Sequence, residues 1–569
     1  MTAAVAGTTA ERRRHPLLVW AWGLVRLDFW GVAVGALFFC LSLTPSLLPR
    51  DWLFCGLIGG VNAAIGYGIG VVLGKAVRPL RVSPRVALRA KAITVAVSVG
   101  ASVLMVVPAA AWQRQVAALM GTQGPSTLEY LQTLIVAIAV AGVLVGLSRV
   151  LLDAVKALAR YLIRRWHVND EVAMFIGTAV MVVLIVTLVN GVLTRGFFAA
   201  ASAVFQPKNS STRAGITAPT QPERSGSPAS YAAWDTLGYQ GRNFVATGPH
   251  ADELTQLNGR PAKEPIRVYA GLQTADTAAG QISVLLSELD RTHAFDRKVM
   301  VIIPTTGTGW VDPVAARAIE TMYNGDTALV AMQYSYLPSW ISFLADQQKA
   351  LDAGKQLVDA VHDRWVRLPV DHRPKLMLYG ESLGSMAGQG AFDYLPDIPQ
   401  MGFTAVLWEG PPDASPLWRA LVVRRDPGTP EVEPRYDNGR TVRFSQGPDI
   451  GAVAAPPWEG TRVLFVQHAS DPVVWWSPDL LVTRPDWLRE PPGYGRTTAM
   501  HWYPIVTFWQ VGADLTEASS VPVGHGHHYG DQALDGWVAV AAPDGWTPAD
   551  TDRVRRVLEK VEASGGPEY

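Results

Sequence analysis

Five apolar stretches crowd the first 200 residues of this 569-residue chain, and each is about as long as a membrane-spanning helix. A helix needs about 20 apolar residues to cross the hydrocarbon core of a bilayer. The stretches are nearly free of charged residues, so a soluble protein would have to bury all five. They cover residues 29–48, 52–74, 92–112, 129–149 and 173–194. We therefore predict a multi-span helical membrane domain over residues 1–205.

Lysine and arginine are distributed unevenly between the loops that join these stretches. Residues 1–28 and the loops after the second and fourth stretches carry 4, 6 and 5 of them, whereas the alternate loops carry only Arg50 and Arg114. Loops rich in Lys and Arg stay in the cytoplasm. Five spans then place everything after the last one outside the cytoplasmic membrane. A further apolar stretch, residues 17–25, borders on charged residues and is predicted to lie in the membrane interface. Its insertion as a further span is the alternative, and would reverse the side on which the C-terminal part lies.

The charge balance changes between the two halves of the chain. The first 200 residues carry 18 Lys+Arg and 7 Asp+Glu, and the remainder carries 31 and 42. This split predicts a basic membrane part joined to an acidic soluble part, and nothing in it points to a nucleic-acid partner. Residues 206–230 are rich in Pro, Ser, Thr and Gly and are predicted to be a flexible linker. The soluble domain is expected over residues 231–569.

The soluble part alternates between strand and helix patterns. Short apolar runs typical of buried strands cover residues 298–304, 327–334, 375–380, 402–410 and 461–468. Residues 345–368 have helical spacing over several turns. Continuous apolar strands that alternate with helices predict an α/β domain, with a mostly parallel sheet covered by helices on both faces.

One short motif in this part suggests chemistry. Gly380, Ser382 and Gly384 form the pattern G-x-S-x-G directly after a predicted strand and before a small-residue helix. A nucleophile elbow needs this arrangement, because the serine occupies a strained turn and the glycines let strand and helix approach closely. Ser382 is therefore the candidate nucleophile.

A serine nucleophile needs a base, and the base needs an acid that orients it. Asp471 follows the strand pattern 461–468 and is the expected acid, with Glu409 as the alternate. The segment VPVGHGHHYG offers several histidines, of which His525 is the first choice for the base and His527 the second. Such a cluster could also bind a metal ion. No Cys and few acidic residues lie nearby, so we expect neither a metal nor another cofactor.

The oxyanion of an acyl-transfer intermediate needs two N–H donors. Leu383 follows the serine, and the glycine-rich turn TTGTGW supplies Thr306 or Gly307. Tryptophans are frequent between the motif and the histidines, where they fill either an apolar acyl pocket or the core. These are Trp408, Trp418, Trp458, Trp475, Trp476, Trp487, Trp502 and Trp509.

The chain also resembles a known group of actinobacterial membrane proteins, an α/β-hydrolase family with a dedicated multi-span N-terminal domain. The matching stretches are SLTPSLLPRDW, GYGIGVVLG, GRNFVATGP, EPIRVYAGL, SELDRTHAFDRKV, TTGTGW, QYSYLPSW, GESLGS, WEGPP and GHGHHYG. The resemblance covers nearly the whole chain and implies an α/β-hydrolase fold, but it implies no particular substrate.

These observations together predict a membrane-anchored serine hydrolase or acyltransferase that acts on an acyl ester outside the cytoplasmic membrane. Anchoring favours a lipidic substrate and membrane lipids as partners. A hydrolase-like domain that binds or regulates without turnover is the alternative. A transporter is disfavoured, because the apolar stretches hold no acidic or basic residue at mid-membrane.

Overall fold

The computed structural model describes residues 27–76, 84–188, 191, 196, 206–338, 341–343 and 347–564. The chain divides into two compact units. The helical unit consists of residues 1–44, 50–111 and 125–192, and the α/β unit consists of residues 45–49, 112–124 and 193–569. The apolar stretch 17–25, expected in the membrane interface, lies outside the described residues.

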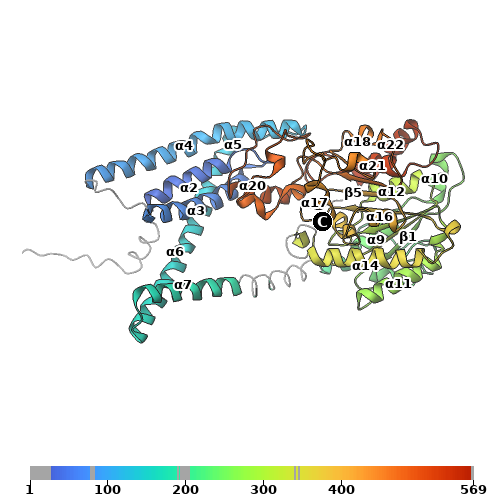
Figure 1. Cartoon of the computed structure of the whole chain (residues 1–569), viewed down its shortest axis with the longest axis horizontal. Coiled ribbons are helices and arrows are strands. Elements are labelled where there is room, and N and C mark those ends of the chain that lie inside the picture. Colours follow the sequence, from blue (N-terminus) through green and yellow to red (C-terminus); the bar gives the residue numbers. More distant parts are fainter. Residues whose placement is uncertain are drawn as a thin grey trace, which may run out of the picture. The chain divides into compact units, whose positions relative to one another are not determined.

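Long apolar helices build the helical unit, as the hydropathy pattern predicts (Figure 1). They are α2 (Phe29–Ser42), α3 (Trp52–Ala76), α4 (Pro84–Leu119), α6 (Gln132–Trp166) and α7 (Asp170–Thr187). A helix of only four residues, α5 (Thr127–Tyr130), precedes α6. Among the described residues, four stretches are long and apolar enough to cross a membrane. These are Trp52–Ala76, Arg89–Leu119, Thr127–Trp166 and Asp170–Thr187.

The first expected span, residues 29–48, differs from the prediction. Only the 14 residues of α2 are helical there. A helix of that length extends about 21 Å, which is less than the roughly 30 Å of a hydrocarbon core. Pro45 and Pro49 follow the helix closely and disfavour its continuation. Residues 45–49 belong instead to the α/β unit.

Glycines allow α3 to pack closely against two other helices. A Cβ on Gly66 would lie 2.7 Å from the carbonyl oxygen of Val34 in α2. A Cβ on Gly60 would lie 2.5 Å from the side chain of Val140 in α6. Small residues at such positions let membrane helices approach each other where the hydrophobic effect gives no driving force.

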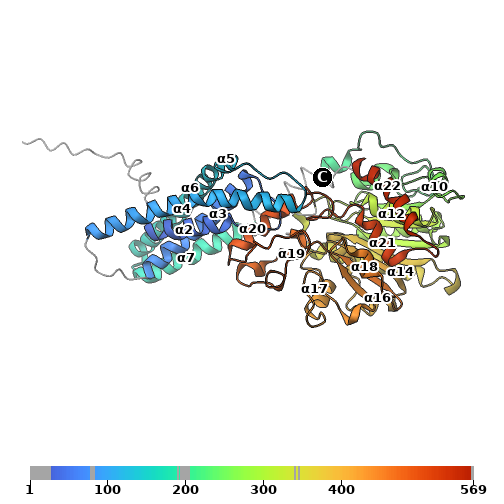
Figure 2. The same ribbon diagram turned by 90° about the horizontal axis from the view of Figure 1, so that it is seen from above.

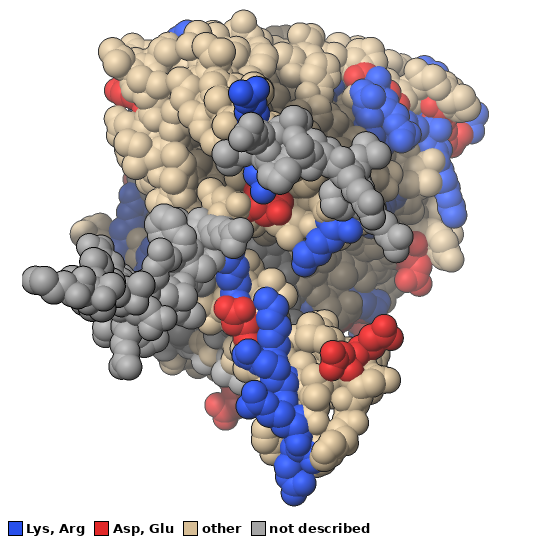
Figure 3. All heavy atoms as spheres, turned by 90° about the vertical axis from the view of Figure 1, so that its left-hand side faces the viewer, with Lys and Arg blue, Asp and Glu red and all other residues tan. Residues whose placement is uncertain are grey.

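Basic side chains gather at one end of α6. The helix continues beyond the fourth expected span to Trp166, so the basic loop expected after that span is helical. Lys156, Arg160, Arg164 and Arg165 are exposed along it. Figure 3 shows Lys and Arg side chains crowded at the lowest point of the molecule in that view, where α6 meets α7.

A single parallel sheet forms the centre of the α/β unit, which confirms the predicted fold class. Among the described residues it has seven strands in the order β1-β3-β2-β4-β5-β7-β6. The strands are β1 (Ile266–Ala270), β2 (Val299–Pro304), β3 (Thr327–Met332), β4 (Lys375–Glu381), β5 (Phe403–Glu409), β6 (Val442–Ser445) and β7 (Arg462–Val466). All five predicted strands are present. The two edge strands, β1 and β6, were not predicted.

Helices cover both faces of this sheet (Figures 1 and 2). One face packs against α9 (Gly238–Ala246), α12 (Pro313–Met322), α21 (Gln532–Ala541) and α22 (Pro548–Ser564). The other packs against α11 (Ala278–Arg291), α14 (Gln347–Trp365) and α17 (Pro416–Val423). Successive strand residues alternate between the two apolar cores, so side chains at the strand ends are fixed in direction.

The predicted linker, residues 206–230, is packed against the sheet in its C-terminal part. The N–H group of Ser225 donates to the carbonyl oxygen of Arg267 in β1 (3.0 Å), and the N–H group of Arg267 donates to that of Glu223 (3.2 Å). Arg224 is fully buried. The α/β unit therefore begins before residue 231. Composition suggested a linker because turn-forming residues are common both in linkers and in ordered loops.

Two further segments correct the predicted domain boundaries. Residues 45–49 and 112–124 lie within the predicted membrane domain but belong to the α/β unit. Leu47, Leu48 and Val116 are each only 1% exposed and join one of its two apolar cores. The α/β unit is thus built from three separate parts of the chain.

Replacing Arg224 tests whether the C-terminal part of residues 206–230 belongs to the folded α/β unit. Its guanidinium donates to the carbonyl oxygens of Val245, Gly248 and Pro249 and forms a 2.8 Å ion pair with Glu264. Arg224→Ala leaves these acceptors buried, so we expect the free energy of unfolding of the α/β unit to fall by about 3–5 kcal/mol. Denaturant unfolding of the full chain, followed by tryptophan fluorescence, measures this.

The exposed Arg260 provides a matched control. Arg260→Ala is expected to change the free energy of unfolding by less than about 0.5 kcal/mol. Equal effects of the two substitutions would contradict a structural role for Arg224.

Candidate active site

Ser382 occupies a strained turn between β4 and α15 (Leu383–Gln389). Its backbone has φ 56° and ψ −127°, a conformation that residues other than glycine rarely adopt. The N–H group of Ser382 donates to the carbonyl oxygen of Glu409, at the end of β5 (2.9 Å). This hydrogen bond holds the turn at the C-terminal edge of the sheet, with the serine side chain largely buried.

The two glycines of the motif have a steric role that can be read directly. A Cβ on Gly380 would lie 2.5 Å from the carbonyl oxygen of Gly384. A Cβ on Gly384 would clash with the carbonyl oxygen of Pro304, the last residue of β2. The strand, the helix and the end of β2 therefore meet at distances that only glycine permits.

Asp471 lies five residues beyond the end of β7 and is completely buried. Its Oδ1 accepts a hydrogen bond from the N–H group of Val473 (2.8 Å), which caps the short helix α19 (Pro472–Trp475). Its Oδ2 accepts from the hydroxyl of Tyr529 (2.7 Å) and lies 2.7 Å from Nδ1 of His527. Asp471 thus both begins a helix and holds a histidine.

His527 lies against Gly410, just beyond the end of β5. A Cβ on Gly410 would clash with the His527 ring, and Gly410 directly follows Glu409, which accepts the hydrogen bond from Ser382. The imidazole is largely buried, with an edge-to-face contact to Tyr529 (5.7 Å between centroids). Its Nε2 has no hydrogen-bond partner among the described residues. Because Asp471 lies against Nδ1, the second ring nitrogen, Nε2, is the one that could accept a proton.

The other histidines of the loop have different surroundings. His525 stacks on Tyr494 (5.6 Å between centroids), and burial lowers the pKa of its imidazole. Nδ1 of His528 contacts the carbonyl oxygen of Val521 (2.8 Å). The structure places His527, and not the first choice His525, against Asp471.

The expected oxyanion donors lie on two sides of the elbow. Leu383 is the first residue of α15, where N–H groups lack acceptors within the helix. The N–H group of Thr306 donates at 3.4 Å to the carbonyl oxygen of Trp310 in its own turn. Gly307 packs closely against the segment after β3. A Cβ on Gly307 would lie 2.6 Å from Oγ of Ser342 in that segment. The N–H group of Thr306 is thus directed to Trp310, whereas that of Leu383 lies at the start of α15.

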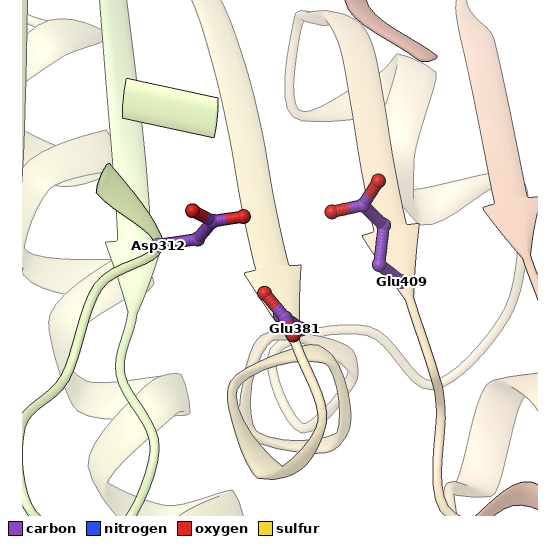
Figure 4. Close-up of side chains that lie close together, drawn as sticks. All are labelled: Asp312, Glu381 and Glu409. Carbon is purple, nitrogen blue, oxygen red and sulfur yellow. The ribbon is translucent and has the colours of Figure 1, made fainter. Parts of the chain in front are cut away.

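Glu409, the alternate acid, belongs to a separate group of carboxylates. Figure 4 shows its side chain directed toward Asp312, with Glu381 below. Carboxylate oxygens of the three residues lie within 4.8 Å of one another. The hydroxyl of Tyr379 donates to Oε2 of Glu409 (2.7 Å). Burial and the charge of Asp312 raise the pKa of Glu409 to about 8.

This carboxylate group has the oxygen ligands that a hard cation such as Mg²⁺ or Ca²⁺ takes. A shared proton meets the same electrostatic need, because a neutral Glu409 removes one of the buried negative charges. The raised pKa of Glu409 favours the proton at neutral pH.

A cavity of about 650 Å³ lies beside α15. This volume is within the usual size range of small-molecule sites. Phe343 and Trp476 line it and pack in one apolar cluster with Leu383 and Met386 of α15. Asp413 and other polar residues form most of the remaining lining, and burial raises the pKa of Asp413 to about 6.

Five of the tryptophans between the motif and the histidines have one of two roles. Trp476 lines this cavity. Trp408, Trp418, Trp475 and Trp487 are at most 2% exposed and fill the core.

Two parts of the site were not predicted. Tyr529, which donates to Asp471, is the tyrosine of the GHGHHYG stretch, so a signal for it was present beside the histidines. Asp312 precedes the first residue of α12 and Glu381 is the last residue of β4, and no local pattern joins them to Glu409.

Comparison with known proteins gives two family matches. A model described as an α/β-hydrolase family matches residues 266–554, and a model described as the N-terminus of that family matches residues 43–249. No curated protein and no solved structure matches the chain.

The neutral Glu409 predicts a pH dependence of stability. Because its pKa rises from 4.5 to about 8 on folding, the folded state keeps a proton that the unfolded chain releases in this window. The free energy of unfolding should therefore fall as pH rises from 4.5 to about 8. Glu409→Gln has nearly the same shape and keeps an oxygen that accepts from the hydroxyl of Tyr379, but its side chain cannot titrate. We expect it to be more stable than the wild type by a few kcal/mol at the alkaline end.

Unfolding midpoints of the full chain at the two ends of this window measure the difference. The exposed Glu559 of α22 supplies the control, since Glu559→Gln should leave the pH profile of the wild type unchanged. A Glu409→Gln profile parallel to that of the wild type would contradict a neutral Glu409.

Proposed function

Because this chain belongs to the α/β-hydrolase family, we propose that it is a membrane-anchored serine hydrolase or acyltransferase that acts on an acyl ester. Ser382 is the nucleophile, His527 the base and Asp471 the acid that orients the base. The assignment of the base differs from the first expectation, His525, because the geometry favours its neighbour.

One observation carries this proposal. A serine with φ 56° and ψ −127° directly follows β4, and its N–H group donates to Glu409 at the end of β5. A histidine that is bonded to a buried aspartate lies against Gly410, the residue after Glu409. Backbone strain of this kind costs about 1–3 kcal/mol and persists where the surroundings enforce it. A strained serine beside a histidine–aspartate pair supports nucleophilic catalysis.

The proposed reaction begins when Oγ of Ser382 attacks the ester carbonyl carbon and Nε2 of His527 takes the hydroxyl proton. Asp471 stabilises the imidazolium that forms, through Nδ1. The tetrahedral intermediate then breaks its bond to the alcohol oxygen, which receives the proton from His527. Water, or the hydroxyl of a second acceptor, attacks the acyl-serine in the same way and restores Ser382.

The oxyanion of each intermediate needs N–H donors that are in place beforehand. Leu383 supplies one from the start of α15, where the helix dipole also favours negative charge. Gly307 is the favoured second donor. Thr306 is less suited, because its N–H group is directed to Trp310.

Two features favour a lipidic substrate. The cavity beside α15 has an apolar wall that includes Phe343 and Trp476. The helical unit contains four stretches able to cross a membrane by length and composition. An anchored enzyme meets membrane lipids at a high local concentration, which a soluble substrate would not require.

The sidedness of the α/β unit follows from its three chain segments. Residues 45–49 and 112–124 come from the stretches of the membrane half that are poor in Lys and Arg, and both belong to this unit. The segment that joins α3 to α4 and the C-terminal part of α6 are rich in Lys and Arg. Under the positive-inside rule these two are the cytoplasmic segments. We therefore propose that the α/β unit lies outside the cytoplasmic membrane, whether or not α2 spans it.

Labelling by a fluorophosphonate tests the catalytic assignment. Ser382→Ala should abolish labelling of the purified full chain, because no nucleophile remains. His527→Ala should slow labelling by at least about 10³-fold. His525→Ala, in the same loop and of the same size change, should stay within a few-fold of wild type. Labelling that depends on His525 and not on His527 would contradict the proposed base.

A series of p-nitrophenyl esters tests the substrate class. The full chain in detergent micelles should hydrolyse long-chain esters faster than short-chain ones. Trp476→Ala should shift this preference toward longer chains, because it enlarges the cavity. Trp509→Ala removes an exposed tryptophan that does not line the cavity and should leave the preference unchanged. A preference for short chains in the wild type would remove the lipidic part of the proposal.

A further inference from the structure

The loop between α2 and α3 is anchored to the α/β unit by a buried hydrogen-bonded carboxylate. The hydroxyl of Ser46 donates to Oδ2 of Asp514 (2.6 Å), and the N–H group of Leu47 donates to the same oxygen (3.1 Å). Ser46 is fully buried and Asp514 is 1% exposed. Hydrogen bonds to a buried charged group are among the stronger ones in proteins.

Asp514 lies shortly before the histidine loop, which is the segment VPVGHGHHYG at residues 521–530. It is the last residue of α20 (Val506–Asp514), and a short turn then brings the chain to Ala518. The carbonyl oxygen of Ala518 accepts a hydrogen bond from the N–H group of His527 (2.7 Å). A group that fixes the end of α20 therefore fixes the acceptor that holds the main chain of His527.

The same loop also packs beside His527. A Cβ on Gly526, the residue before His527, would lie 3.3 Å from Cδ2 of Leu48. On its other side, the N–H group of Gly526 donates to Oγ of Ser470 (3.0 Å), next to Asp471. The histidine loop is thus held by residues 45–49 and also by Ser470, the residue before Asp471.

We propose that Ser46, acting through Asp514, is a positioning residue for His527. The inference rests on the proposed function, because it gives the histidine its role as base. Ser46 neither contacts a substrate nor lines the cavity beside α15. Its loss should therefore lower the rate of the chemical step without weakening binding, since a base displaced by about 1 Å can cost up to 10²-fold in rate.

The test compares Ser46→Ala with a matched buried serine in the full-length protein. Ser225→Ala removes a hydroxyl that is also fully buried and also donates to a carboxylate, Oε2 of Glu288 (2.9 Å), beside β1. β1 and β7 lie at opposite sides of the sheet, so Ser225 is remote from His527. The measurement is the rate of fluorophosphonate labelling as a function of probe concentration.

We expect the maximal labelling rate of Ser46→Ala to fall by about 10- to 100-fold, with the half-saturating probe concentration unchanged. Ser225→Ala should stay within about two-fold of wild type. Ser46→Thr keeps the hydroxyl and should recover most of the rate. Asp514→Asn, which keeps an oxygen acceptor for Ser46 and Leu47, gives an intermediate rate and covers the case in which Ser46→Ala does not fold.

Two results would overturn the inference. One is a maximal rate for Ser46→Ala within two-fold of wild type. The other is an equal loss in Ser46→Ala and Ser225→Ala, which would mean that only general stability had changed. A wild-type protein that labels independently of Ser382 and His527 would instead refute the proposed function, so the two failures are distinguishable.

Discussion

The close approach of α15 to the ends of β2 and β4 is the constraint on which the candidate active site depends. Gly384 lies against the carbonyl oxygen of Pro304, and Gly380 lies against that of Gly384. With no side chain at either position, the main chain can turn sharply enough to give Ser382 its positive φ. The hydrogen bond from Ser382 to Glu409 then ties this turn to the neighbouring strand.

Two buried carboxylates near this turn differ because of what surrounds them. Asp471 is surrounded by donors from Val473, Tyr529 and His527. Glu409 faces Asp312 and Glu381, and burial with the charge of Asp312 raises its pKa to about 8. The first arrangement surrounds a carboxylate with hydrogen-bonding groups, and the second favours a proton on Glu409. Sequence order alone made both residues candidates for the same role.

Much of the fold could be predicted from the sequence, and the misses have physical reasons. The central strands are continuous apolar runs, which is the strongest signal of a buried parallel sheet. β1 and β6 each carry an arginine that breaks this pattern. Arg267 is buried because Glu320 pairs with it (2.7 Å), and Arg443 is held by main-chain carbonyls such as that of Gly439 (2.7 Å). The partner of Arg267 is 53 positions away and leaves no local trace. The partners of Arg443 are main-chain groups, which no side-chain pattern reveals.

The site was predicted in type but not in every residue. The spacing of the glycines around Ser382 follows from local sterics, so the motif could be read from the sequence. The choice between His525 and His527 depends on which ring reaches Asp471, and residues two positions apart in a glycine-rich loop give no basis for it. Sequence composition also placed residues 45–49 and 112–124 entirely in the membrane domain, because partners such as Asp514 lie more than 400 positions away.

The three-part construction of the α/β unit has a consequence for how the protein is made. Leu47, Leu48 and Val116 leave the ribosome long before the strands whose core they complete. Domains generally fold as units during synthesis, from the N-terminal side onward. Here the earliest segments must wait, with apolar side chains uncovered, until α20 and the histidine loop have been translated. Assembly of the α/β unit therefore joins segments that were synthesised first to segments that are synthesised near the end of the chain.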